Sequence, residues 1–174
     1  MLTHADMSDL YGDVVTLDAE RVAPLGLRDV DARVLIDVGL PRFAAPSFTV
    51  EVEGGPDFLT FFDVETKFGP QREVVFGGPP GRLGMRYSVN AGQGFVMLAQ
   101  LRGKAHGEIV NNDLAGFVTF LHAVDSHRIR AAAEPEVAAA SFAELSARLH
   151  ELDPHSFEDP EQWWATILAR VELE

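Results

Sequence analysis

The chain has 174 residues, of which 47% are hydrophobic and 24% are charged, values typical of a single globular domain with a hydrophobic core. Asp and Glu number 27 against 14 Lys and Arg, and this net charge of −13 disfavours a free-standing nucleic-acid-binding protein, which needs a basic surface. The absence of cysteine excludes disulfides, thiolate catalysis and cysteine-ligated metal sites. We see no signal peptide and no apolar run long enough to cross a bilayer, so we expect a cytoplasmic protein without a membrane partner.

The first predicted element is a helix over residues 29–41. Its hydrophobic residues recur at helical spacing: Val30, Val34, Leu35 and Val38. Asp29 can cap its start, and Gly39 followed by Pro41 ends it.

A run of strands follows, because the hydrophobic period changes from helical to alternating. In residues 47–53, Phe48, Val50 and Val52 share one face, which is typical of a half-buried strand. Further strands or extended runs are predicted at 57–65, 72–77, 82–90, 94–101 and 107–110. The short Gly- and Pro-containing breaks leave no room for crossover helices, so these strands should pair as antiparallel neighbours.

Three helices are predicted after the strands. The first begins after Asn caps at Asn111 and carries a hydrophobic stripe of Leu114, Phe117, Val118, Leu121 and Val124. The second covers 134–153, and the third follows a capping-box pattern of Asp159 and Gln162. We therefore predict an α+β fold: a largely antiparallel sheet covered by helices, one before the strands and three after, in a single domain of residues 1–174 with a core at about 29–172.

No catalytic, metal or cofactor site is predicted, and we expect no enzymatic activity. His122 and His127 are five residues apart on one helix and do not share a face. Asp125, Ser126 and His127 are triad residue types, but their adjacency in sequence is not triad geometry. The glycine-rich stretch 76–84 lacks the Lys-Ser/Thr ending of a phosphate-binding loop.

Acidic and aromatic residues in the first strands form a candidate partner-contact surface. It comprises Glu51, Glu53, Asp57, Phe58, Phe61, Asp63 and Glu65, with Phe62 and Phe68 as further candidate anchors. The competing interpretation is that the acids are a solvated strand surface and the aromatics are ordinary core. Residues 134–174 hold a second acidic region, with ten Asp and Glu against two Arg; it would either steer a basic partner or be a solvated helix face.

Four segments, taken in order, resemble the fourth group of the SUKH superfamily of immunity proteins: residues 32–43, 109–121, 151–164 and 166–172. The matching positions are structural. Gly39 and Pro41 match the end of the first helix; Asn111, Leu114, Phe117 and Leu121 match a helix cap and core stripe; Asp153, Pro154 and Trp163 or Trp164 match the closing motif.

The resemblance implies an α+β fold and a non-enzymatic immunity role in bacterial polymorphic-toxin systems. Such a protein binds and neutralises a cognate toxin domain, often a nuclease or a deaminase. We expect that domain to be basic, because the chain is acidic, and we expect no cofactor and no direct contact with nucleic acid. The alternatives are a housekeeping protein-interaction scaffold of the same fold and, ranked last, a small hydrolase that uses scattered histidines and carboxylates.

Overall fold

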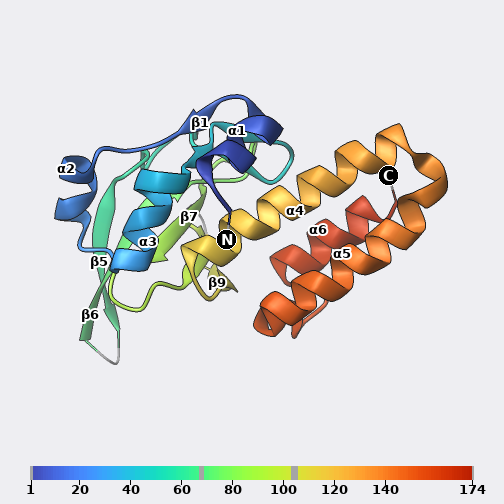
Figure 1. Cartoon of the computed structure of the whole chain (residues 1–174). Helices are drawn as coiled ribbons and strands as arrows, with labels where there is room; N and C mark the ends of the chain where they lie inside the picture. The colour runs from blue at the N-terminus through green and yellow to red at the C-terminus, as the bar shows by residue number, and fades with distance from the viewer. Residues whose placement is uncertain (1, 67–68, 103–105, 174) are drawn as a thin grey trace.

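The computed structural model describes residues 2–66, 69–102 and 106–173 (Figure 1). Before the main sheet come α1 (His4–Tyr11), β1 (Val14–Val15), α2 (Ala19–Val22), α3 (Asp29–Arg33), β2 (Leu40–Pro41), β3 (Phe43–Ala44) and β4 (Phe48–Thr49). The sheet consists of β5 (Phe61–Thr66), β6 (Gly69–Gly77), β7 (Met85–Asn90), β8 (Val96–Gln100) and β9 (His106–Asn111). After it come α4 (Leu114–Ala133), α5 (Ala138–Leu152) and α6 (Trp163–Val171).

The predicted α+β class is confirmed. The strands lie in the order β5-β6-β7-β8-β9, and each pairs antiparallel with its neighbour in the chain. Short connections without helices leave this meander as the simplest pairing, as the turn spacing predicted. Two register shifts interrupt it, one between Val75 and Gly77 and one between Val96 and Met97.

The predicted first helix is present, but its details differ. It starts after Arg28 rather than being capped by Asp29, and Val30 is 59% exposed. After Arg33 the helix widens into a π-helical segment, Val34–Val38, and the Gly39 N–H donates to the Val34 carbonyl at 2.7 Å. Gly39 then leaves the helix at φ +89°, where a Cβ would lie 2.5 Å from the Val14 side chain.

The N-terminal region is more ordered than the sequence suggested. The first predicted element begins at residue 29, yet α1 and α2 precede it, and the His4 ring Nδ1 lies 3.1 Å from the Val38 carbonyl. Only Met7 of α1 is buried, so the helix has no apolar stripe for a pattern search to find. The predicted strand at 47–53 is also shorter, since only Phe48–Thr49 pairs, with β3.

Aromatic rings fill the space between the sheet and the helices. Phe76 and Tyr87 project from adjacent strands, and the Phe117 ring of α4 lies 5.2 and 4.8 Å from them, measured between centroids. Phe48 packs against all three rings, and Trp164 of α6 lies 5.9 Å from Phe117. Such tilted and edge-on pairs add to the free energy gained by burial, so this cluster is the centre of the core.

A buried polar network joins the end of β9 to the C-terminal helices. The Asn111 Oδ1 atom accepts a hydrogen bond from the Trp164 indole at 2.8 Å, and its amide donates to Asp153 at 3.3 Å. The Asp153 carboxylate also accepts the backbone and side-chain N–H groups of Asn112 at 2.9 and 2.8 Å. Asn111 is therefore not the helix cap that we predicted. That position belongs to Asp113, which accepts the Gly116 N–H at 2.6 Å.

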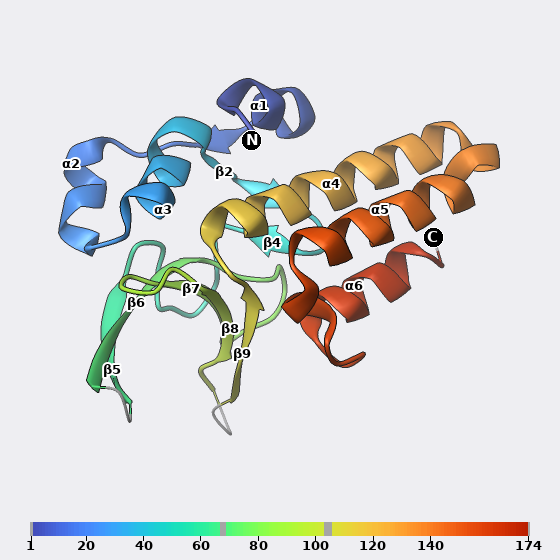
Figure 2. The ribbon, with the colours of Figure 1, turned by 60° about the horizontal axis from the view of Figure 1, so that its bottom comes forward.

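All the longer helices gather on one side of the sheet. Figure 2 shows α3 and the first half of α4 over the sheet, with α5 and α6 lying beside α4, while the lower face of the sheet carries none of the described helices. Successive strand residues face opposite sides, so each strand contributes one set of side chains to the core and another to this open face. The side chains that point into the core are Val74, Phe76, Tyr87, Val89, Val96, Leu98 and Val110.

A mostly buried carboxyl group also links α1 to α4. The Tyr11 hydroxyl donates to Asp125 Oδ2 at 3.0 Å, and the Arg128 guanidinium lies 3.7 Å from Oδ1. Burial raises the pKa of Asp125, and the hydrogen bond from Tyr11 and the charge of Arg128 oppose this increase only in part. Burial also raises the pKa of the Tyr11 hydroxyl, which therefore stays protonated and remains a donor at neutral pH.

We expect Asp153→Ala to lower the free energy of unfolding by about 3 kcal/mol, because it leaves buried donors of Asn111 and Asn112 without an acceptor. Urea denaturation at pH 7 measures this change. Glu151→Ala, two residues earlier at an exposed position, is the matched control and should change the value by no more than about 0.5 kcal/mol. Equal losses in the two variants would contradict a structural role for this network.

The stability of the protein should also depend on Asp125 in a defined direction. Because its pKa is raised in the native state, the native protein binds more protons than the unfolded chain at pH values above the unfolded pKa of about 3.9. Its contribution is present at low pH and is lost as the pH rises through the native pKa. Asp125→Asn should therefore gain stability relative to the wild type between pH 4 and pH 7 in urea denaturation.

Asp9→Asn, at an exposed position of α1, corrects for the loss of one negative charge. A stability difference between Asp125→Asn and the wild type that stays flat or falls with pH would show that burial does not govern this carboxyl group.

Candidate functional site

The structure separates the predicted partner-contact residues into two groups. Glu51 and Glu53 lie on the segment after β4, whereas Phe61, Asp63 and Glu65 alternate along β5, the edge strand, and so share one of its faces. Two further predicted contact residues lie between these groups in the chain: Asp57 is exposed, and Phe58 is half-buried and packs against the core. Phe68 lies outside the described residues.

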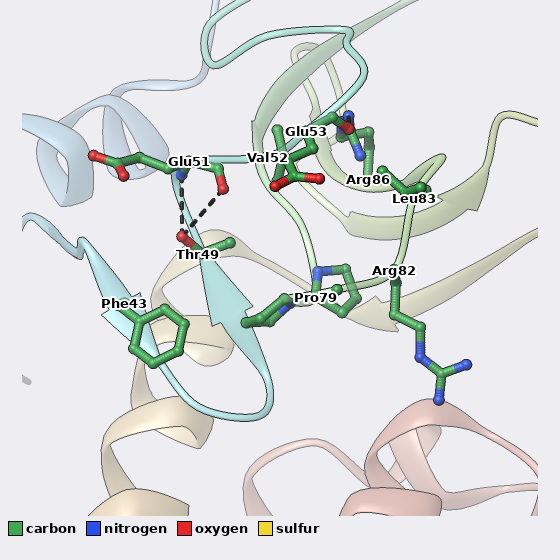
Figure 3. A pocket seen from close by; sticks show the side chains of 11 residues that line it. Phe43, Thr49, Glu51, Val52, Glu53, Pro79, Arg82, Leu83 and Arg86 are labelled. Carbon is green, nitrogen blue, oxygen red and sulfur yellow. Dashed lines mark hydrogen bonds between the residues drawn. The ribbon is translucent and has the colours of Figure 1, made fainter.

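A pocket of about 290 Å³ lies beside Glu51 and Glu53 (Figure 3). Its walls are the β3–β4 hairpin, residues 51–53 and the loop at 79–83. Figure 3 shows the Glu53 side chain extending toward the pocket while Glu51 points away from it, and the Glu51 carboxylate pairs with Arg42 at 2.9 Å. No Lys or Arg of the described chain forms a salt bridge with Glu53.

Two large apolar side chains stand at the rim of the same pocket. Phe43 is 55% exposed and Leu83 is 56% exposed. Single exposed apolar residues are common on proteins, but two that flank one pocket beside a carboxylate form a small mixed surface. An apolar anchor and a charge close together are the ingredients of a protein-binding surface.

The residues of the β5 group are less available for contact with a partner than their sequence suggests. Arg72 of β6 binds Asp63 at 3.0 Å, and its guanidinium carbon lies 4.4 Å from the Phe61 ring centroid. The hydrogen bond from Arg72 lowers the pKa of Asp63, so this carboxylate stays charged but is already paired. Glu65, the third residue of this group, is also exposed.

Arg86 holds the segment that separates the two groups. This residue is 1% exposed, and its guanidinium donates to the carbonyls of Glu53, Gly55 and Pro56 at 2.7 to 2.9 Å. Burial lowers the pKa of Arg86, but an arginine remains charged at neutral pH. No pattern in the sequence indicates this anchor, because a charged residue in an alternating strand is normally assigned to the solvent side.

A second depression occupies the open face of the sheet. It has a volume of about 380 Å³ and is lined by residues at β5, β6, β7 and β8, together with His106 and Gly107 of β9. Arg86, Ser88 and Asn90 alternate along β7 and share this face; Arg86 lines the pocket of Figure 3, and the other two line the groove. Both depressions are therefore lined by side chains of β7 that share this face.

The residues weighed for catalysis are not assembled into a site. Asp125 binds Tyr11, Ser126 Oγ lies 3.4 Å from His122 Nδ1, and buried His127 instead contacts Ser141 Oγ at 3.1 Å. Burial lowers the pKa of His127, which is consistent with a neutral structural imidazole. Within residues 2–66, 69–102 and 106–173, no three His, Asp or Glu side chains are grouped to hold a metal ion, and no helix is long and apolar enough to span a membrane.

Comparison with known proteins adds one finding. A family model described as "SUKH-4 immunity protein" matches residues 2–170. Neither a curated protein nor a solved structure matches the chain. The matched range includes the first helix with its Gly39 end, the five-stranded sheet, the Asn111–Asp153–Trp164 network and nearly all of α6. Because this match extends over almost the whole sequence, the chain belongs to the SUKH-4 immunity protein family.

Proposed function

We propose that this protein binds the cognate toxin domain of a bacterial polymorphic-toxin system and neutralises it in the cytoplasm of the producing cell. The family match over residues 2–170 carries the proposal. The toxin domain is a basic protein, such as a nuclease or a deaminase, and this chain acts on it by binding rather than by catalysis.

The charge of the chain supports a basic partner. At a net charge of −13, long-range attraction raises the rate of encounter with a basic domain and orients it toward carboxylate-rich surfaces. Charge alone does not make a tight complex, which also needs apolar anchors that become buried. The pocket of Figure 3 offers both kinds of group, with Glu53 between the exposed side chains of Phe43 and Leu83.

Co-expression with the toxin-like domain encoded beside this gene tests the proposal. We expect growth rescue together with a stable complex whose affinity falls as the salt concentration rises. A well-folded protein that gives neither rescue nor a complex would contradict toxin neutralisation and favour the interaction scaffold of the same fold.

Among the acids of the first strands, Glu53 should contribute most to association. Glu53→Lys should lower the association rate constant for the toxin domain about tenfold at low salt, measured by surface plasmon resonance. Adding Glu51→Lys and Asp63→Lys should lower the association rate constant by a smaller factor for each substitution than Glu53→Lys does. The reason is that those two carboxylates are already paired with Arg42 and Arg72.

Glu144→Lys, at an exposed position of α5, is the control for net charge. If Glu53→Lys and Glu144→Lys slow association equally, the total charge of the chain rather than the Figure 3 pocket governs encounter. If neither variant slows association at low salt, the acidic surface plays no part in recognition.

A further inference from the structure

The open-face groove has walls that are almost entirely apolar. Phe62 and Val64 of β5 form one side, and Met97, Ala99 and Leu101 at β8 form the other. Val64 and Leu101 are each 40% exposed. Ile109 pairs with Met97 across the β8–β9 ladder and extends the exposed apolar strip to the edge of the sheet. Contiguous exposed apolar side chains of this kind are suited to contact with a partner.

The floor of this groove contains a carboxylate. Glu73 is 5% exposed, and its two oxygens accept hydrogen bonds from Ser88 Oγ and Asn90 Nδ2, each at 2.8 Å. Gln71 holds the same Asn90 amide at 2.8 Å. The donors around Glu73 are therefore neutral, and no described Lys or Arg forms a salt bridge with it.

This arrangement leaves Glu73 able to bind a cation. A carboxylate can accept about four hydrogen bonds, and the described side chains supply two. Burying a negative charge without a cation is unfavourable, so a positive group entering the groove would meet an acceptor that is already oriented and partly desolvated. The buried arginine on this face, Arg86, already donates to the backbone carbonyls of Glu53, Gly55 and Pro56.

We propose that the open face of the sheet is the docking surface for the toxin domain, and that the Glu73 carboxylate accepts hydrogen bonds from an arginine side chain of that domain. The inference rests on the proposed function and names its binding surface. The occupant is an arginine flanked by apolar side chains, on a loop or an extended segment of the partner. Arginine suits this groove better than lysine because its guanidinium is less strongly hydrated, binds a carboxylate through two N–H groups and stacks on aromatic rings such as Phe62 and Phe95.

The two depressions then act at different stages of binding. Glu53 is exposed at the rim and influences encounter, whereas Glu73 is buried and stabilises the complex once it has formed. The long-range field of the acidic chain brings the basic domain to this side, and the groove retains one of its side chains.

The test is surface plasmon resonance with a catalytically inactive form of the adjacent toxin-like domain and three variants of this chain. Glu73→Gln keeps the shape of the side chain and removes its charge; we expect the affinity to fall at least about 30-fold, mainly through faster dissociation. Val64→Lys, at the mouth of the groove, leaves the contacts of Glu73 in place and should weaken binding at least about tenfold by opposing an incoming cation. Glu144→Gln on α5 is the matched control and should bind like the wild type.

Circular dichroism and thermal melting show whether each variant is folded. If Glu73→Gln does not fold, Val64→Lys still tests whether the groove binds the toxin domain. Wild-type affinity in both groove variants, with binding by the wild type intact, would overturn this inference and leave the proposed function standing. A wild type that does not bind the domain would overturn both. A loss in Glu73→Gln that appears only in the association rate would also contradict the inference, because a buried pair acts on dissociation.

Discussion

The hydrogen bonds around Asn111 and Asp153 determine how the two halves of this protein fit together. Asn111 ends β9, Asp153 ends α5 and Trp164 belongs to α6, so one buried network joins the last strand to the last two helices. Each of these polar groups would be unfavourable in the core without its partners. The network therefore positions the Trp164 ring against Phe117 and Phe120 and holds the helical layer on one face of the sheet.

A second buried carboxylate has a similar role at the start of α4. Asp31 of α3 is 1% exposed, pairs with Arg28 at 2.6 Å and accepts the Leu114 N–H at 3.2 Å. Together with the Asp113 cap, it places negative charge at the positive end of the α4 dipole. Helices before and after the sheet are thus fastened to each other above the same face, and none of the described helices covers the opposite face (Figure 2).

This one-sided arrangement connects the fold to the family role. An inhibitor needs a rigid surface, since ordering a flexible one on binding reduces affinity. Strands whose core side is fully packed present such a surface on their other side. Arg86 stiffens one end of it by holding three carbonyls of residues 53–56, and Glu73, Ser88 and Asn90 form its polar floor. Core residues and the residues that we propose for recognition thus alternate along the same strands.

The sequence by itself determined the α+β class, the antiparallel order of the strands and the helices that follow them, because hydrophobic period and turn residues are local signals. It also indicated the family, through ordered motifs around Gly39, Asn111 and Asp153. Only the tertiary structure decided that Asn111 is a buried link rather than a cap, that Asp63 is paired with Arg72, and that Glu73 lies in an apolar groove. Such features depend on strand register and on contacts between residues far apart in the chain, which the periodicity of one segment cannot encode.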